Sequence, residues 1–323
     1  MKRVVLTLLF ALLCGAVMPV EAYADKRAKA REQVLERSRG YYKDIFMDSG
    51  IALTSRTYLP SARYLGVSIE YFASASKKKL TAKDTLLQRQ VLVGSDEDTN
   101  GWLLYPDGAP RFRMIYVNGG SASKHAASFG DAGRERIGEY VASGGSYFGT
   151  CAGAFLGTRG AKYVSGYRFV DKFLTIWPGY GHSTRLTKSS TTLTLGRKSP
   201  LLRYYDFGKD YAVDSVRHNG GCYACEIVEG TEPLARYKFN NTEKVKIDGE
   251  LCIWAYKPSK SGGRTVLCGS HPEGVESGER LKLTAAMLLY AMDGNPDPQI
   301  KALLENGKTR EMNKRTEDRD PQY

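Results

Sequence analysis

The chain has 323 residues, of which 42% are hydrophobic and 25% are charged, as is usual for a globular protein with a sizeable core. Its net charge of +12 favours contact with an anionic cell-wall or surface polymer or with an acidic substrate. A solvated basic surface without a specific partner would give the same charge. Nucleic acid is not expected as a partner, because no recognisable binding motif is present.

The N-terminus has the pattern of a secretory signal peptide. Lys2 and Arg3 precede an apolar run over 4–20, and an A-x-A cleavage site ends at Ala24. We therefore expect residues 1–24 to be removed and the protein to be periplasmic or secreted. An uncleaved anchor helix is the alternative, which the shortness of the apolar run disfavours. No later segment is apolar enough to cross a membrane, so no transmembrane segment is expected after cleavage.

Export bears on how the cysteines are used. Five cysteines follow the predicted signal peptide: Cys151, Cys222, Cys225, Cys252 and Cys268. An odd number in an oxidising compartment predicts that one thiol stays free, and Cys151 is the candidate. Cys252 with Cys268, on two strands of an expected hairpin, and Cys222 with Cys225 could form disulfides. A redox site at this C-x-x-C motif is less favoured because the motif does not open a helix.

The first half of the chain alternates predicted strands and helices. A charged N-terminal leader over 25–49 precedes this region. The predicted elements are strands over 50–54, 86–93, 112–117 and 147–150 and helices over 59–75 and 134–142. Such alternation predicts an α/β fold with a mainly parallel sheet flanked by helices, whose functional groups lie at the carboxyl edge of the sheet.

The second half changes character after residue 150. It contains short strand-like runs separated by turns, over 191–195, 211–217, 233–237, 250–256 and 265–268. We expect these runs to extend the same sheet in antiparallel fashion, and an amphipathic helix over 281–292 to pack back on it. One domain over 50–292 is therefore predicted, followed by a polar C-terminal tail over 293–323.

The segment Gly149-Thr150-Cys151-Ala152-Gly153 has the form of a nucleophile elbow, G-x-C-x-G. In such a turn a strand ends, the nucleophile is lifted above the sheet edge, and small flanking residues let strand and helix approach closely. A thiol at this place would lie near unpaired N–H groups at a helix N-terminus, which favour the thiolate and an oxyanion. A tightly packed structural cysteine is the alternative interpretation.

A second motif lies about 120 residues downstream, where His271-Pro272-Glu273 follows the last predicted strand. A histidine and a carboxylate at this spacing can serve as the base and the orienting acid for a cysteine nucleophile. Glu273 could instead be a surface carboxylate after a turn. No metal ligand set with zinc spacing is found, and neither a metal nor another cofactor is expected.

Together these motifs resemble the class I glutamine amidotransferase-like superfamily, whose fold is flavodoxin-like. The resemblance rests on three motifs: Asn118-Gly119-Gly120 after a buried strand, the cysteine elbow and the His-Pro-Glu motif. The segment 140–154 resembles more narrowly the domain at the N-terminus of some biotin–protein ligases, and the segment 217–221 is similar to a glycine-rich element of that domain. Biotin ligation is not expected from this resemblance, and neither is glutamine-dependent amidotransfer in the strict sense.

The resemblance implies roles for particular residues. Cys151, His271 and Glu273 would form a catalytic triad, and the N–H groups of Gly120 and Ala152 would form the oxyanion hole. Four further residues are candidates for lining the substrate cleft: Gly119, His218, Asn219 and Gly220.

The sequence is compatible with two functions, one of an enzyme and one of a binding module. The first is an exported cysteine hydrolase or peptidase-like enzyme that acts on an amide, isopeptide or γ-glutamyl-type bond of a small-molecule or peptide-like substrate through an acyl-enzyme. The second is a non-catalytic ligand-binding or stress-related module that keeps the elbow for structure. Thiol chemistry at Cys222 and Cys225 is a weaker third alternative.

Overall fold

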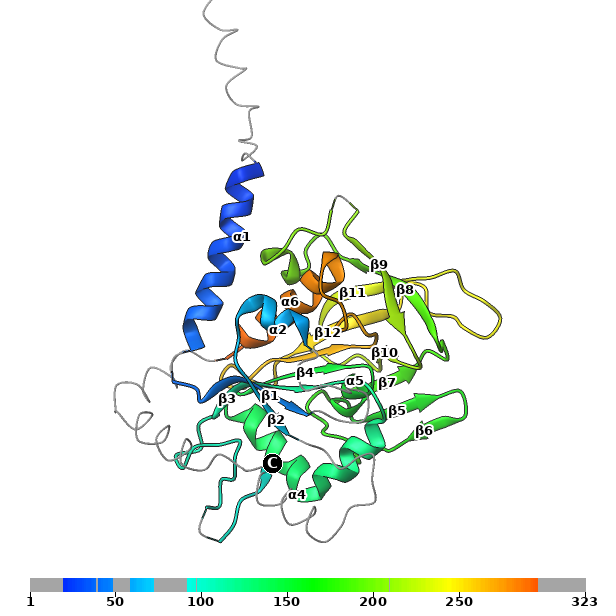
Figure 1. Cartoon of the computed structure of the whole chain (residues 1–323). Coiled ribbons are helices and arrows are strands. Elements are labelled where there is room, and N and C mark those ends of the chain that lie inside the picture. The colour runs from blue at the N-terminus through cyan, green and yellow to red at the C-terminus, as the bar shows by residue number, and fades with distance from the viewer. Residues whose placement is uncertain are drawn as a thin grey trace, which may run out of the picture.

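The computed structural model describes residues 20–38, 40–48, 59–72, 92–96, 98–208 and 210–295 of the chain. Nine strands form its main sheet, in the order β2-β1-β3-β4-β13-β12-β11-β8-β9 (Figure 1). These strands are β1 (Lys43–Asp48), β2 (Ile69–Phe72), β3 (Phe112–Val117), β4 (Ser146–Thr150), β8 (Ser189–Leu195), β9 (Ala212–His218), β11 (Glu232–Lys238), β12 (Leu251–Tyr256) and β13 (Thr265–Cys268). From β2 to β13 the neighbours are parallel, and from β13 to β9 they are antiparallel. The predicted α/β fold with an antiparallel extension is therefore confirmed.

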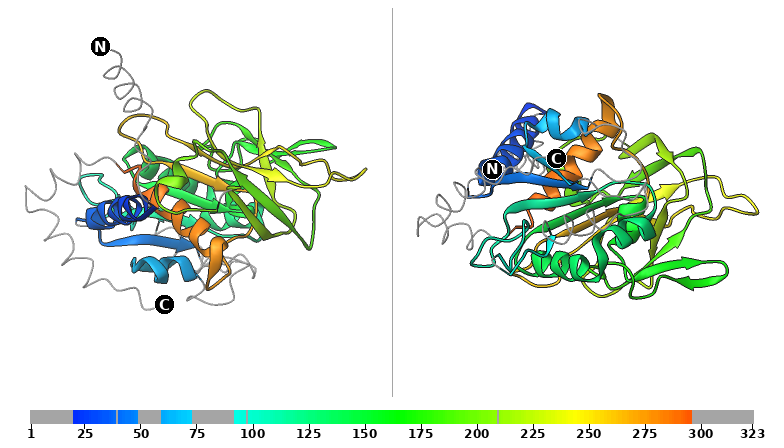
Figure 2. Two further views of the ribbon diagram at one scale, coloured as in Figure 1. Left: turned by 90° about the horizontal axis from the view of Figure 1, so that it is seen from above. Right: turned by 60° about the horizontal axis from the view of Figure 1, so that its bottom comes forward.

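Helices cover both faces of the parallel part. They are α1 (Val20–Leu35), α2 (Pro60–Leu65), α4 (Ala122–Ala142), α5 (Ala152–Leu156) and α6 (Gly278–Met292), with short 3-10 turns at Glu36–Ser38 and Pro200–Arg203. The right view of Figure 2 shows α2 and α6 on one face of the sheet and α4 on the other. None of the described helices combines the length and the apolar character that a membrane crossing needs.

The central strands are buried on both faces, which explains their nearly continuous apolar sequence. Alternate side chains of β1, β3 and β4 belong to two separate cores. Ile45, Met47, Met114, Tyr116 and Phe148 pack in the core that contains α6, while Phe46, Ile115, Val117 and Tyr147 pack in the core that contains α4. The period of two in a strand thus divides one hydrophobic sequence between the two layers.

A second sheet of four short strands lies beside the main one, in the order β10-β7-β5-β6. Its strands are β10 (Cys222–Cys225), β7 (Tyr180–Ser183), β5 (Gly160–Tyr163) and β6 (Gly166–Arg168). This sheet was not predicted from the sequence, because runs of only three or four residues give little strand signal.

The structure differs from the sequence prediction near the N-terminus. A single helix over 59–75 was predicted, but α2 ends at Leu65 because Gly66 takes a left-handed conformation (φ 69°) and caps it. Ile69 then begins β2, which pairs with β1. β1 itself lies within 25–49, where only a leader was expected, so the sheet includes residues before Gly50. The strand predicted over 50–54 and most of the strand predicted over 86–93 lie outside the described residues. The described end of the latter, Leu92 and Val93, is not part of a strand.

Most of the predicted signal peptide also lies outside the described residues. The described part begins at Val20 with α1, so the predicted cleavage site after Ala24 falls within this helix. Arg27 and Arg31 of α1 donate hydrogen bonds to the carbonyl groups of Leu202 and Tyr204, which attaches the helix to the domain.

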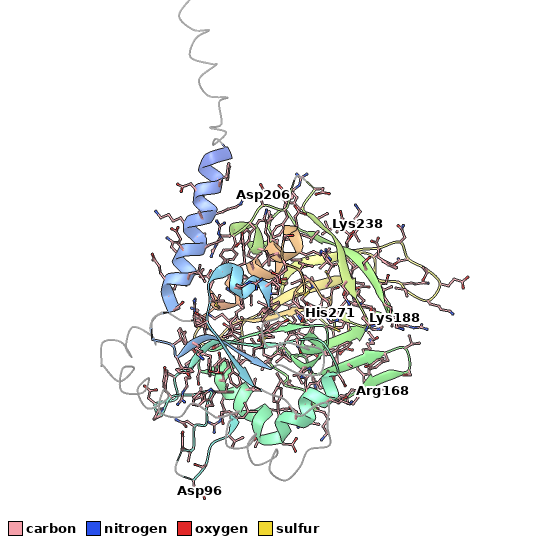
Figure 3. All side chains as sticks on the ribbon, in the orientation of Figure 1. Asp96, Arg168, Lys188, Asp206, Lys238 and His271 are labelled. Atoms are coloured by element: carbon pink, nitrogen blue, oxygen red, sulfur yellow. The ribbon has the colours of Figure 1, made fainter. Side chains whose placement is uncertain are left out.

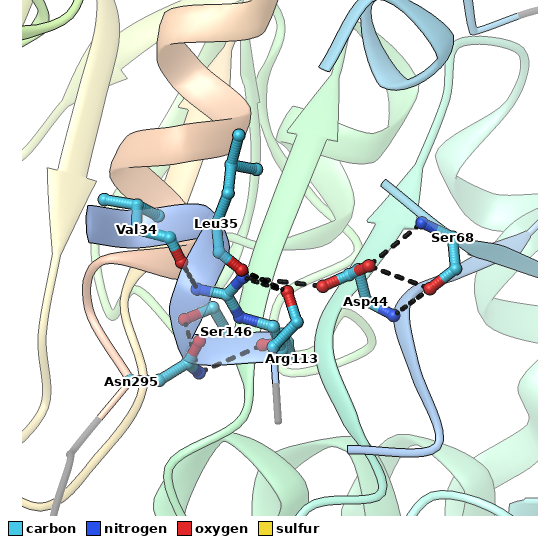
Figure 4. Close-up of polar contacts among 8 residues, drawn as sticks. Val34, Leu35, Asp44, Ser68, Arg113, Ser146 and Asn295 are labelled. Carbon is cyan, nitrogen blue, oxygen red and sulfur yellow. Dashed lines mark hydrogen bonds and ion pairs between the residues drawn. The ribbon is translucent and has the colours of Figure 1, made fainter. Parts of the chain in front are cut away.

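A buried arginine connects the N-terminal elements to the sheet (Figure 4). Arg113 on β3 is fully buried, and its guanidinium donates to the carbonyl of Val34 at 2.8 Å and lies 3.4 Å from the carboxylate of Asp44. Asp44 accepts hydrogen bonds from the N–H and hydroxyl of Ser68. Burial lowers the pKa of Arg113, and the charge of Asp44 opposes that effect. Arg113 and Asp44 therefore each supply the opposite charge that offsets the cost of burying the other.

We expect Arg113→Met to destabilise the fold by about 3 kcal/mol or more, because the substitution leaves Asp44 buried without its counter-charge. The free energy of unfolding in urea measures the effect. The matched control is Arg63→Met, which breaks an exposed ion pair with Glu276 and should cost about 1 kcal/mol or less. Equal losses in the two variants would contradict this account of Arg113.

Candidate active site

The elbow forms where β4 meets α5. Cys151 lies between them with φ 49° and ψ −103°, an unusual conformation for a residue with a side chain. The flanking glycines make the turn sterically possible. A Cβ atom on Gly149 would lie 2.3 Å from the carbonyl oxygen of Gly153, and one on Gly153 would lie 2.0 Å from that of Val117. The predicted close approach of strand and helix is therefore confirmed.

Pairing between β4 and β13 brings the second motif to the elbow. The two strands are parallel, with Cys268 opposite Thr150, and the N–H of Cys151 donates to the carbonyl of Cys268 at 2.8 Å. The chain leaving β13 then reaches His271 above the same sheet edge. The N–H of His271 donates to the carbonyl of Arg217, which fixes the backbone of this segment against the end of β9.

Cys151, His271 and Glu273 lie in a row. The thiol of Cys151 donates to the carbonyl of Asn219 at 3.8 Å, and the imidazole of His271 lies close enough to the sulfur for Cys151 to raise the pKa of the histidine. Its Nδ1 lies 2.9 Å from Oε1 of Glu273, and because a carboxylate only accepts, Nδ1 carries the proton and Nε2 is left for the sulfur. Figure 3 shows His271 in the middle of the molecule, whereas Asp96, Arg168 and Lys238 lie at its periphery.

The electrostatics of the row favour a charged imidazole. Burial lowers the pKa of His271, but the hydrogen bonds and negative charges of Cys151 and Glu273 outweigh it and raise the value to about 10. The imidazolium is therefore the prevailing form at neutral pH. It faces the sulfur on one side and the carboxylate on the other.

Residues that the sequence analysis did not single out support Glu273. The hydroxyl of Thr150 donates to Oε1 of Glu273 at 3.2 Å, and the hydroxyl of Tyr116 lies 3.1 Å from Thr150. Glu273 is 6% exposed. Thr150 directly precedes Cys151 in the sequence, and this adjacency is the signal that could have identified it.

Gly119 and Gly120 lie on the other side of the row. A Cβ atom on Gly119 would be 2.2 Å from Cε1 of His271, so only glycine lets the imidazole lie where it does. Gly120 has φ 134°. Within the described part of the chain, the N–H groups of Gly120 and Ala152 donate to no other group. Both donors are thus available, as the predicted oxyanion hole requires.

The row opens into a cavity of about 270 Å³. Gly119 and Asn219, two of the predicted cleft residues, line this cavity together with Cys151 and His271. The cavity wall also includes Asn118, Arg217 and Arg280, which were not predicted to face a substrate.

His218, predicted to line the cleft, lies behind it. Its side chain is fully buried, and its two ring nitrogens are hydrogen-bonded to Thr184 at 2.7 Å and to Ser270 at 2.8 Å. Burial and the charge of His271 lower the pKa of His218 to about 4, so the ring stays neutral. Gly220 does not line the cavity either. His218 therefore holds the segment before His271 and does not face a substrate.

The predicted disulfides do not form: Cys222, Cys225, Cys252 and Cys268 are all free thiols. Cys222 and Cys225 stand three residues apart on one strand, so their side chains point to opposite faces of the sheet. Cys268 lies opposite Ile253 in the strand pairing, one place away from Cys252. Burial raises the pKa of Cys222 and raises that of Cys225 to about 11, which disfavours the alternative of a redox site there.

Comparison with known proteins adds a family. A family model described as the N-terminal part of biotin–protein ligase matches residues 108–311. The chain belongs to this family. The match extends from before β3 to beyond α6, so the elbow, the His-Pro-Glu motif and the cavity all lie inside the family domain. The resemblance inferred from the sequence motifs is confirmed.

Individual relatives are more distant. An uncharacterized protein of Chlamydia muridarum (strain MoPn / Nigg) is 29% identical over 134 residues, which make up 40% of this chain and 50% of that protein. The chain thus aligns with about half the length of this curated relative. Among solved structures, a glutamine amidotransferase has a TM-score of 0.44 at 15% identity, over 76% of this chain and 98% of that one. PurLQS from Thermotoga maritima has a TM-score of 0.42 at 12% identity, over 77% and 98%.

We expect Cys151→Ala to lower the pKa of His271 from about 10, because the sulfur contributes both a hydrogen bond and a charge that raise it. NMR titration of the imidazole measures the value in the native protein and in the variant. Cys225→Ala is the matched control, since this thiol lies outside the row. An unchanged His271 titration in Cys151→Ala would show that the two side chains are not coupled.

Proposed function

We propose that this protein is an exported cysteine hydrolase that cleaves an amide, isopeptide or γ-glutamyl-type bond through an acyl-enzyme. The observation that carries the proposal is the row of Cys151, His271 and Glu273 beside an open cavity, with His271 hydrogen-bonded to Glu273 and its pKa raised by Cys151. A buried structural cysteine would need neither an adjacent imidazole nor a carboxylate to orient it.

The first half of the reaction forms a thioester. The sulfur of Cys151 attacks the substrate carbonyl, and the N–H groups of Gly120 and Ala152 stabilise the resulting oxyanion. The imidazolium of His271 then donates its Nε2 proton to the leaving amine as the carbon–nitrogen bond breaks. Since the pKa of His271 is raised to about 10, this proton is present throughout the neutral range.

The second half releases the acid. After the amine has left, the neutral His271 accepts a proton from water, which attacks the thioester carbonyl. The carbon–sulfur bond breaks and Cys151 is restored beside a protonated imidazole. Glu273 keeps Nδ1 protonated during both steps and so presents Nε2 to the reacting atoms.

We expect iodoacetamide to alkylate Cys151 at pH 7 about tenfold more slowly in His271→Ala than in the native protein, because the variant removes the imidazolium beside the sulfur. Mass spectrometry of the peptide that contains Cys151 measures both rates.

The control is His182→Ala, because this histidine stacks on Tyr223 in the second sheet and does not line the cavity. Equal alkylation rates in the native protein and in His271→Ala would count against the hydrolase and favour a binding module. If the two rates differ as expected, hydrolysis of an amide library should be lost in Cys151→Ala.

Export is part of the proposal and rests on the N-terminal sequence pattern. Cleavage after Ala24 would place Asp25 at the mature N-terminus, within the helix that Arg27 and Arg31 attach to the domain. We expect the N-terminal sequence of the protein from a secreting host to begin at Asp25. Ala24→Lys, which removes the small residue before the cleavage site, should leave the longer chain uncleaved. A native protein that keeps residues 1–24 would overturn this part of the proposal.

A further inference from the structure

Two arginines line the same cavity as the row. Arg217 lies near the end of β9, and Arg280 lies in the first turn of α6, so two elements far apart in sequence each bring an arginine to one cavity. Arg280 is held by a hydrogen bond of 3.0 Å from Nη1 to the carbonyl of Ser215. The backbone of Arg217 is bonded to His271, which fixes its place relative to the reacting groups.

The positive charge of these arginines is not balanced within the site. Glu273 is the acidic residue of the cavity wall, and its Oε1 already accepts from His271 and Thr150. Within the residues that the structure describes, no carboxylate pairs with Arg217 or Arg280. With His271 also protonated, the cavity is suited to an anion.

Asn118 provides a second and independent observation. Its side chain is fully buried at the cavity wall, and neither its amide nitrogen nor its amide oxygen has a hydrogen-bond partner in the described structure. A buried amide without partners is unfavourable and rare in native proteins. A polar ligand in the cavity would satisfy it.

We propose that the cavity binds substrates that carry a carboxylate close to the scissile amide, with Arg217 and Arg280 holding the carboxylate. The planar guanidinium matches a carboxylate with two parallel hydrogen bonds. A cavity of about 270 Å³ is slightly below the usual range of about 300–1,000 Å³ for small-molecule sites, which favours an acyl group of amino-acid size. This inference rests on the proposed hydrolase function and names the substrate class.

The test compares two reagents that alkylate the same sulfur. Iodoacetate carries a carboxylate and iodoacetamide a neutral amide, and in both reactions a carbon–sulfur bond forms and iodide leaves. The rate for each reagent at Cys151 is followed by peptide mass spectrometry, which separates it from Cys225. The ratio of the two rates then reports the preference of the cavity for an anion, because any change in the thiol itself affects both rates.

We expect the ratio of the iodoacetate rate to the iodoacetamide rate to fall by about tenfold in Arg217→Gln and in Arg280→Gln, as expected for loss of a hydrogen bond to a charged group. Arg197→Gln is the matched control, since it removes the same charge from an exposed residue outside the cavity. Its ratio should stay within about twofold of the native one, because exposed charges at a distance are screened by salt. Equal ratios in the native protein and all three variants would overturn the inference.

A binding measurement tests the carboxylate site without alkylation or catalysis. Glutarate should raise the melting temperature of the native protein more than its neutral analogue glutaramide, and Arg217→Gln should remove the difference. No difference in the native protein would count against the carboxylate site. If glutarate binds but His271→Ala leaves the alkylation rate of Cys151 unchanged, the hydrolase proposal fails while the anion site stands.

Discussion

The parallel pairing of β4 with β13 is the contact on which the candidate site depends. Its register places Cys268 opposite Thr150, so the two strands end together at one edge of the sheet. Cys151 follows one strand directly, and His271 follows the other after two residues. A shift of one residue would exchange the faces of every side chain on β13, so the buried residues of both cores oppose such a slip. Core packing thereby fixes the geometry of the site.

Glycines provide the clearance that this geometry needs. Gly149 and Gly153 let the elbow turn within contact of β3, and Gly119 lets the imidazole of His271 lie against the loop that follows β3. The three positions share one physical requirement, which is a backbone approached too closely for a Cβ atom. The motifs are therefore specific for steric reasons as well as chemical ones.

Two histidines near each other have opposite electrostatic environments. His271 is protonated because Cys151 and Glu273 flank it, whereas His218 stays neutral because it is buried with hydroxyl partners and repelled by His271. The neutral ring bonds Ser270 and holds the segment on which His271 stands. Of the two histidines, only His271, which faces the cavity, therefore carries a positive charge.

The sequence by itself determined the α/β class and the elbow, and it offered the His-Pro-Glu motif as a candidate partner of Cys151, because each of these depends on a local pattern. The pairing of β4 with β13 then decided that His271 lies beside Cys151. Hydrophobic periodicity, small residues around a turn and chemical residue types are all visible within a few neighbouring positions. The N-terminal strand β1 and the four-stranded sheet were missed, since strands of three to six residues gain their stability from partners distant in the chain.

Only the tertiary structure decided which residues face the cavity. Arg217 and Arg280 are ordinary charged residues in the sequence and become neighbours because β9 and α6 meet at the sheet edge. His218 looked like a cleft residue, yet the alternation along β9 turns it inward while Arg217 is exposed. Two cysteine pairs looked suited to disulfides, yet all four thiols are free. Side-chain direction depends on strand pairing and on which face the core covers, and both are properties of the whole fold.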